Sequence, residues 1–279
     1  MMTGEDVYAG VGAAPQPERS VSVHDLAHRF PGTDVLFEHL DFTAIPGQTV
    51  AICGPSGCGK STLLRCFNRM NDDIKDCRIE GKIALDGQDI LGDYDICRLR
   101  QRVGMVFQNP SAALNPVMTV AQQVGLPLYL HYDLTLAERL ERVTRMLDKV
   151  GLGEEVLCKY PHELSGGQRQ RVGIATALVT SPRLIIADEP TTALDSITQR
   201  QIVDLLTSLV DDANASMLFI THDFAVLSRA TTRCYVLDQG RIAESGATAD
   251  VLAHPGTDEG RRLVEAARAL SLHVEHEGA

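Results

Sequence analysis

The stretch GPSGCGKST, residues 54–62, has the residue types and the spacing of a phosphate-binding loop. It joins a short apolar run, Thr49 to Cys53, to a segment with helical periodicity. Its glycines allow backbone amides to turn inward and meet oxyanions without side-chain clashes. Lys60 would reach the terminal phosphates as a point charge, the Ser61 hydroxyl would bind Mg²⁺, and the helix that begins there would direct its positive end at the phosphates. A chance glycine-rich turn is the alternative, but the flanking strand and helix favour a nucleotide site.

Three further apolar runs end in polar side chains that suit phosphate chemistry. Residues 184–189, LIIADE, form an Ile-rich run typical of a buried strand, and the run ends in Asp188 and Glu189. Carboxylates there are costly to desolvate unless a cation is near, so Asp188 would hold the water shell of Mg²⁺ and Glu189 would orient an attacking water. Two acids that merely cap a turn are the alternative. Gln108 and His222 end the other two runs, and the coincidence favours function over simple strand termini.

A second helix start able to meet an anion lies in LSGGQRQRVGIATAL, residues 164–178. Ser165 can cap this helix, while Gly166 and Gly167 leave its first amides uncovered. Taken alone, a Ser-capped helix with a flexible entry is the simpler interpretation. Phe30 has two interpretations as well, because it is either a core or turn aromatic or a ring on which a base stacks.

The elements that must position these residues alternate between strand and helix patterns. The expected strands lie at residues 21–30, 36–42, 49–53, 82–85, 103–108, 184–189 and 217–222. Residues 109 to about 164 differ, because their apolar residues share a helical face, Thr135 and Glu138 have capping-box spacing, and Gly151 is placed to end the helix. The pattern predicts an α/β protein with a helical insert, which serves as a lid or as a partner surface.

Composition narrows the class of protein. The chain has 279 residues, of which 44% are hydrophobic, so it can bury the core of one large or two small domains. Its formal charge of −11 argues against broad nucleic-acid binding, which depends on cationic surface. Its seven cysteines form no CxxC pair and are expected to be reduced thiols, not a disulfide frame or a zinc site. We expect neither a membrane-spanning run nor an export signal.

Six motifs in one order resemble the ATP-binding subunit of ABC transporters: GPSGCGKST, Gln108, LSGGQ, LIIADE, TTALD and His222. The match extends from about Val21 to Ala253. The resemblance implies an α/β fold in which a RecA-like P-loop NTPase core carries an antiparallel β subdomain and a helical insert. The expected regions are a tail (1–19), the ATPase domain (20–255) with its insert at about 109–165, and a C-terminal helix and tail (256–279).

The resemblance also implies a role for each site residue. Phe30 matches the aromatic that stacks on adenine, which is usually Tyr in the family, so the ring face is kept and only a hydroxyl is lost. His222 would contact the γ-phosphate. The catalytic residues implied are Glu189, His222 and Lys60, and the implied Mg²⁺ ligands are Ser61, Gln108 and Asp188. The residues implied to bind ATP are Phe30, Gly54, Pro55, Ser56, Gly57, Cys58, Gly59, Lys60, Ser61, Thr62, Gln108, Ser165, Gly166, Gly167, Gln168 and Asp195.

The partners follow from the same resemblance. In such proteins the LSGGQ signature of one copy faces the phosphate loop of another, so a head-to-tail homo- or heterodimer with ATP at both interfaces is expected. The Gln108 loop and the helical segment would pass motion to transmembrane permease subunits, and a substrate-binding protein would complete the system. The resemblance implies a peripheral position on the cytoplasmic face of the cell membrane and no nucleic-acid partner.

The substrate class rests on stretches that differ in their resemblance. Residues 107–120, FQNPSAALNPVMTV, look like the peptide and nickel importer class, whereas residues 66–72, CFNRMND, look like the phosphate importer class. The region after Gln108 contacts the membrane partner, so the peptide/nickel class is favoured, although Gly256 and Thr257 depart from the HPYT often found there. The rivals are a soluble ABC-type ATPase acting on ribosomes or DNA, and a small-molecule kinase or GTPase that would leave LSGGQ without a role.

Overall fold

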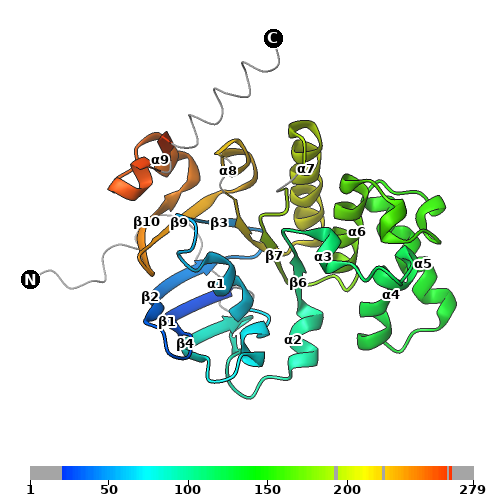
Figure 1. Ribbon diagram of the computed structural model, residues 1–279, viewed down its shortest axis with the longest axis horizontal. Coiled ribbons are helices and arrows are strands. Elements are labelled where there is room, and N and C mark those ends of the chain that lie inside the picture. The colour runs from blue at the N-terminus through cyan, green and yellow to red at the C-terminus, as the bar shows by residue number, and fades with distance from the viewer. Residues whose placement is uncertain (1–20, 192–193, 222–223, 263, 266–279) are drawn as a thin grey trace, which may run out of the picture.

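A six-stranded sheet lies at the centre of the computed structural model (Figure 1), which describes residues 21–191, 194–221, 224–262 and 264–265. The strand order is β10-β9-β3-β8-β7-β6, and all neighbours are parallel except the β10–β9 hairpin at one edge. Every residue of β3, β7 and β8 is buried, as expected for parallel strands covered on both faces. The strands are β3 (Thr49–Cys53), β6 (Val103–Val106), β7 (Leu184–Asp188), β8 (Ser216–Ile220), β9 (Arg233–Asp238) and β10 (Arg241–Ala247).

A second, antiparallel sheet with the order β2-β1-β4-β5 packs beside the first. Its strands are β1 (Val21–Arg29), β2 (Val35–Ala44), β4 (Arg78–Leu85) and β5 (Gln88–Asp89). Irregularities in the pairing of β1 with β2 coincide with left-handed backbone at Asp25 and His39, whose φ angles are 48° and 53°. Such bulges bend and twist the sheet locally.

Helices cover both faces of the central sheet, and those of residues 110–149 form a group on the side away from β1, β2 and β4 (Figure 1). The helices are α1 (Lys60–Cys66), α2 (Ile96–Arg102), α3 (Pro110–Ala113), α4 (Val120–His131), α5 (Leu136–Lys149), α6 (Gly166–Leu178), α7 (Ser196–Ala213), α8 (Phe224–Ala230) and α9 (Thr248–Ala253). Short 3₁₀ turns in the described part of the chain lie at Met70–Asp73, Glu154–Val156 and Pro161–Glu163. The α/β architecture with a helical group is the fold class predicted from the sequence.

Local signals for the helix ends are confirmed at α5, where Thr135 and Glu138 form the capping box. The expectation for α1 is wrong, because the pattern predicts a helix to about Asn71 whereas α1 ends at Cys66. The backbone of Arg69 takes a left-handed conformation, with φ 56°, and so cannot continue the helix. Its side chain forms an ion pair with Asp72. A positive φ is incompatible with right-handed helix, so the chain breaks into a 3₁₀ turn there.

Side chains of the central strands alternate between two cores. In β7, Ile185 and Ala187 join the core under α6 and α7, whereas Leu184 and Ile186 join the core shared with α1 and the antiparallel sheet. This period of two is what a strand buried on both faces requires. The parallel strands therefore end at the same edge of the sheet. The candidate site residues lie at that edge, directly after the strands.

The contact of β6 with α6 leaves no room for a side chain at Gly104. A Cβ there would lie 2.4 Å from the carbonyl oxygen of Ala177, and the contact is backbone, so it cannot move aside cheaply. Gly104→Ala is expected to lower the free energy of unfolding by about 1–3 kcal/mol, measured by urea unfolding. Gly173→Ala in α6 is the control, because a Cβ there would have no atom within 4 Å apart from the helix's own backbone, and it should stabilise the helix by up to about 1 kcal/mol. A Gly104→Ala protein as stable as the parent would contradict this packing.

Candidate functional site

The phosphate-loop sequence connects β3 to α1 by a turn that only glycine can form. Gly54 has a φ of 146°, and a Cβ on it would lie 2.1 Å from the carbonyl oxygen of Leu237 in the neighbouring strand β9. Gly59, with φ 98°, is the residue before the first turn of α1. Both positions favour glycine because of positive φ, and at Gly54 backbone also fills the space. The loop is therefore held tightly between β9 and the start of α1.

The ammonium of Lys60 lies across the loop that precedes it. Its Nζ donates hydrogen bonds to the carbonyl oxygens of Gly54, at 2.9 Å, and Pro55, at 2.7 Å, and lies 3.8 Å from the sulfur of Cys58. Burial raises the pKa of the Cys58 thiol, and the Lys60 charge opposes that rise. The loop therefore holds the positive charge of Lys60 at the N-terminus of α1, where the helix dipole adds to it.

A buried carboxylate lies beside the loop. The Ser61 hydroxyl donates to Asp188 Oδ1 at 3.0 Å, which joins the first turn of α1 to the end of β7. Asp188 is only 6% exposed, and burial raises its pKa; the Ser61 hydrogen bond opposes that rise, while the Glu189 charge adds to it. A hydroxyl and a costly buried carboxylate next to a phosphate cradle are the hard oxygen donors that Mg²⁺ prefers, so these residues fit the metal.

Gln108 and Glu189 meet just beyond the strands that carry them. Glu189 takes a left-handed conformation, with φ 45°, and its backbone N–H donates to the carbonyl oxygen of Ile220 at 3.0 Å. Its carboxylate accepts a 2.9 Å hydrogen bond from Gln108 Nε2. Positive φ in a residue with a side chain is strained, and such strain is common at functional sites. The structure thus brings together Lys60, Ser61 and these residues at one edge of the sheet.

The signature segment and Asp195 begin two neighbouring helices. Ser165 caps α6: its Oγ accepts a hydrogen bond from the backbone N–H of Gln168, and the side-chain oxygen of Gln168 accepts one from the backbone N–H of Ser165. Asp195 caps α7 by accepting from the backbone N–H groups of Ile197 and Thr198, which lowers its pKa. A Cβ on Gly167 would lie 3.0 Å from a methyl of Thr198, so the two helix starts are in contact.

Phe30 follows β1 in the antiparallel sheet, and its ring packs with an edge-to-face geometry against His28. His222 and Ala193 lie outside the residues that the structure describes. Two contacts of the site escape sequence reasoning: the Leu237 carbonyl that crowds Gly54, and His28 beneath Phe30. The alternation of β1 could have pointed to His28, because residues two apart share a strand face.

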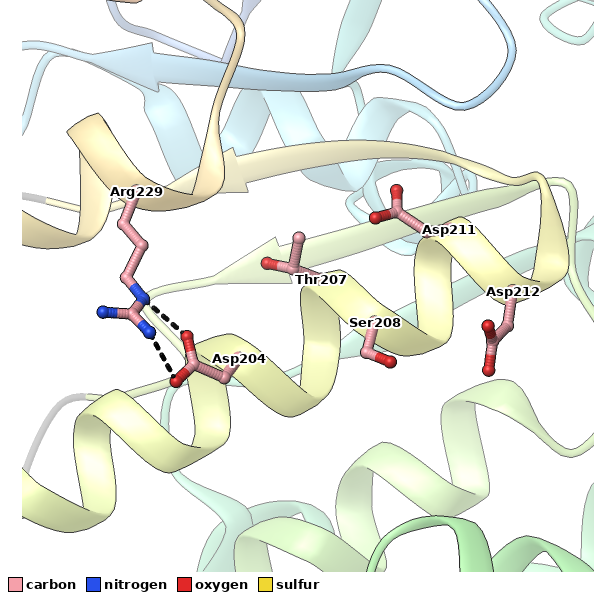
Figure 2. A pocket seen from close by; sticks show the side chains of 6 residues that line it. All are labelled: Asp204, Thr207, Ser208, Asp211, Asp212 and Arg229. Atoms are coloured by element: carbon pink, nitrogen blue, oxygen red, sulfur yellow. Dashed lines mark hydrogen bonds and ion pairs between the residues drawn. The ribbon is translucent and has the colours of Figure 1, made fainter.

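A surface hollow of about 450 Å³ between α7 and α8 lies among residues that no site motif contains (Figure 2). Arg229 makes a two-pronged ion pair with Asp204 there, at 2.6 and 2.9 Å, which joins α8 to α7. The lining residues are Asp204, Thr207, Ser208, Asp211, Asp212 and Arg229. Within the described ranges, no cluster of three or more His, Cys, Asp or Glu side chains could hold a metal.

The geometry defines a P-loop nucleotide-binding cassette, and comparison with known proteins gives its family. The model of the ABC transporter family matches residues 37–192, more than half of the chain. The chain therefore belongs to the ABC transporter family, as one of its ATP-binding cassettes.

Curated relatives include ATP-binding proteins of importers. The chain is 41% identical over 254 residues to the peptidoglycan transport ATP-binding protein YejF of Agrobacterium fabrum, covering 88% of this chain and 46% of that protein. It is 39% identical to the methionine import ATP-binding protein MetN 1 of Pseudomonas fluorescens, covering 85% and 70%. It is 38% identical to the glutathione import ATP-binding protein GsiA of Pectobacterium atrosepticum, covering 89% and 41%. The chain thus spans less than half the length of two of these relatives.

A solved cassette has the same fold. The ATP-binding cassette MJ0796, determined as a dimer in a post-hydrolysis state with ADP and Pi, is 32% identical, and the match covers 82% of this chain and 98% of that chain with a TM-score of 0.71. This match confirms the ABC ATPase fold that the motifs predict.

Replacing the buried carboxylate tests its electrostatic cost. Because burial raises the pKa of Asp188, its ionisation opposes folding above that pKa, and stability recovers as the pH falls through it. Asp188→Asn cannot ionise and should stabilise the metal- and nucleotide-free protein at pH 7 by about 1 kcal/mol, or about 2–4 °C in Tm, with the gain shrinking at acidic pH. Differential scanning calorimetry measures the change. Exposed Asp211→Asn should leave Tm unchanged, and a less stable Asp188→Asn protein at pH 7 would contradict the assignment.

Proposed function

We propose that this chain hydrolyses ATP to power an importer of the peptide class. The single observation that carries the proposal is the hydrogen bond from Ser61 to buried Asp188, next to Lys60. It brings together a hydroxyl and a carboxylate that could bind Mg²⁺, beside a helix start that could bind phosphate. The names of the relatives support the import role. Because two of these relatives are more than twice as long as the match, the activity, substrate and partners of the whole protein rest on this proposal.

The reaction we infer is in-line attack of water on the γ-phosphate. Lys60 would neutralise phosphate charge, and the Gly54–Thr62 loop would hold the phosphates through its backbone. Glu189 would orient the water, whose oxygen bonds to the γ-phosphorus as the bond to the β–γ bridging oxygen breaks. When bound, Mg²⁺ would supply further charge neutralisation, held by Ser61, Asp188 and Gln108.

We infer that Gln108 responds to nucleotide binding, because its amide donates a hydrogen bond to the carboxylate of Glu189. In the proposed function it would exchange this bond for contact with the metal when nucleotide binds. His222 is proposed to contact the γ-phosphate and Phe30 to stack on adenine. The loop after Gln108 leads directly into α3, so a shift of this side chain would be transmitted to the helical segment at about 109–165.

The complete site is proposed to need a second subunit. Ser165 begins a helix with two glycines in its first turn, which suits an anion, and α6 starts next to Asp195 of α7. A head-to-tail partner, identical or related, would place its own Ser165 helix over the ATP held by this chain. The dimeric form of the cassette MJ0796 supports this arrangement.

Membrane permeases are the proposed mechanical partners, with a substrate-binding protein in the full system. Helix α4 supports this, because Leu126, Tyr129 and Leu130 are 41%, 64% and 64% exposed and give the helical segment an apolar face. Among the described helices none is long and apolar enough to cross a bilayer. We propose that the permeases hold the chain at the membrane as a peripheral subunit on the cytoplasmic face.

The ATP chemistry is tested by two substitutions in the site. Glu189→Gln should lower the hydrolysis rate at least about 100-fold while ATP is still bound, since the water loses its anionic acceptor, and the variant should accumulate as a dimer with ATP.

Lys60→Ala should weaken ATP binding about tenfold or more, because it removes charge-assisted hydrogen bonds. Phosphate release, calorimetric titration and size-exclusion chromatography with light scattering measure these effects. Exposed Lys75→Ala is the control and should match the parent. Hydrolysis by Glu189→Gln at the parental rate would contradict its role.

The import role is tested at α4. The double substitution Tyr129→Glu and Leu130→Glu places charge on the exposed apolar face, so it should abolish co-purification with permease subunits encoded beside this chain while ATP binding stays unchanged. Ser208→Glu, on the exposed side of α7, is the matched control. Recovery of ribosomes or DNA with the parent chain, and of no permease, would favour a soluble ABC-type ATPase instead.

A further inference from the structure

Phe30, the proposed platform for the base, rests on a buried histidine. His28 is 1% exposed and lies two residues before Phe30, on the same side of β1. The ring centroids are 4.6 Å apart and the planes cross at 69°, so the two rings meet edge to face. That geometry is favourable for aromatic pairs and restricts how the Phe30 ring can tilt.

His28 is supported in turn from two sides. Its ring lies 5.4 Å from that of fully buried Phe37 in β2, and its Nε2 is 3.2 Å from the sulfur of Cys77. The imidazole is therefore held between strands and cannot change position alone. Burial lowers the pKa of His28, because desolvation disfavours the charged imidazolium.

The same support reaches the phosphate loop. Phe37 and Leu36 pack against Gly59, the residue before α1, since a Cβ there would lie 3.2 Å from Phe37 and 3.1 Å from Leu36. A continuous set of contacts thus runs from Phe30 through His28 and Phe37 to the residue at the start of the phosphate-binding helix. Packed rings of this kind are stiff, so they fix the distance between two ends of a binding site.

Histidine is a costly choice if this position only fills space. Nδ1 of His28 is buried without a hydrogen-bond partner, and an unsatisfied buried nitrogen destabilises a protein. What His28 offers both of its neighbours is an aromatic ring, which contacts Phe30 on one side and Phe37 on the other.

We propose that His28 is a positioning residue for nucleotide binding: through its stack with Phe30 and Phe37 it holds the base platform at a fixed place relative to the phosphate loop. It contacts no nucleotide itself. The inference rests on the proposed function, because it takes Phe30 as the surface that receives the base of ATP. His28 should therefore affect only the contribution of the base to ATP affinity, and not the contribution of the phosphates.

The test compares ATP with inorganic tripolyphosphate, which has the phosphates and no base. Calorimetric titration of the full chain in Mg²⁺ buffer gives both affinities. His28→Ala should weaken ATP binding roughly three- to tenfold, as expected for loss of one aromatic stack, and should leave tripolyphosphate affinity unchanged. The double variant His28→Ala with Phe30→Ala should bind ATP no worse than Phe30→Ala alone, since the two residues act together. His24→Ala, exposed on the same strand, is the matched control.

A second pair of variants keeps the test decisive if His28→Ala fails to fold. His28→Phe retains a ring and should keep the parental ATP affinity, whereas His28→Leu fills the space without a ring and should lose it. Parental ATP affinity in His28→Leu, or an equal loss of ATP and tripolyphosphate affinity, would overturn the inference. A parent chain that binds neither ligand, or Phe30→Ala with parental ATP affinity, would instead count against the proposed function.

Discussion

The site depends on one electrostatic constraint, the burial of the Asp188 carboxylate at the end of β7. The Ser61 hydroxyl donates a hydrogen bond to this carboxylate, and burial raises the pKa of Asp188. The hydrogen bond joins strand to helix, so the position of β7 sets the position of the phosphate loop. The parallel sheet then brings Gln108 and Glu189 to the same edge, where the strained backbone of Glu189 directs its carboxylate to the Gln108 amide.

The other residues of the proposed site lie on different elements, Phe30 next to the antiparallel sheet and Ser165 and Asp195 at the starts of α6 and α7. The rings of His28 and Phe37 connect Phe30 to Gly59, the residue before α1, so the antiparallel sheet packs against the phosphate loop there. The Ser165 and Asp195 helix starts contact each other and are capped within their own chain. This division suits a protein whose nucleotide lies between two copies, because each surface is built before the copies meet.

Sequence reasoning succeeded where the determinant is local. The phosphate loop, the capping box at Thr135, the helix cap at Ser165 and the buried strand before Asp188 were predictable because residue type and spacing set them directly. It failed where distant segments meet. Just after α1 ends, the Arg69 side chain donates a hydrogen bond to the carbonyl oxygen of Gly92, 23 residues away. The ring of His28 in β1 contacts the ring of Phe37 in β2. The alternation of one strand can place His28 near Phe30, but it carries no information on contacts between strands such as that of His28 with Phe37.

The most direct test of the central claim is a crystal structure of the Glu189→Gln protein with Mg²⁺ and ATP. The phosphates should lie in the 54–62 loop, with Mg²⁺ at about 2.0–2.1 Å from Ser61 Oγ. The base should lie against Phe30, and Ser165 of a second copy should face the γ-phosphate. Nucleotide bound elsewhere, or held in this loop by a monomer with Mg²⁺ away from Ser61 and Asp188, would contradict it.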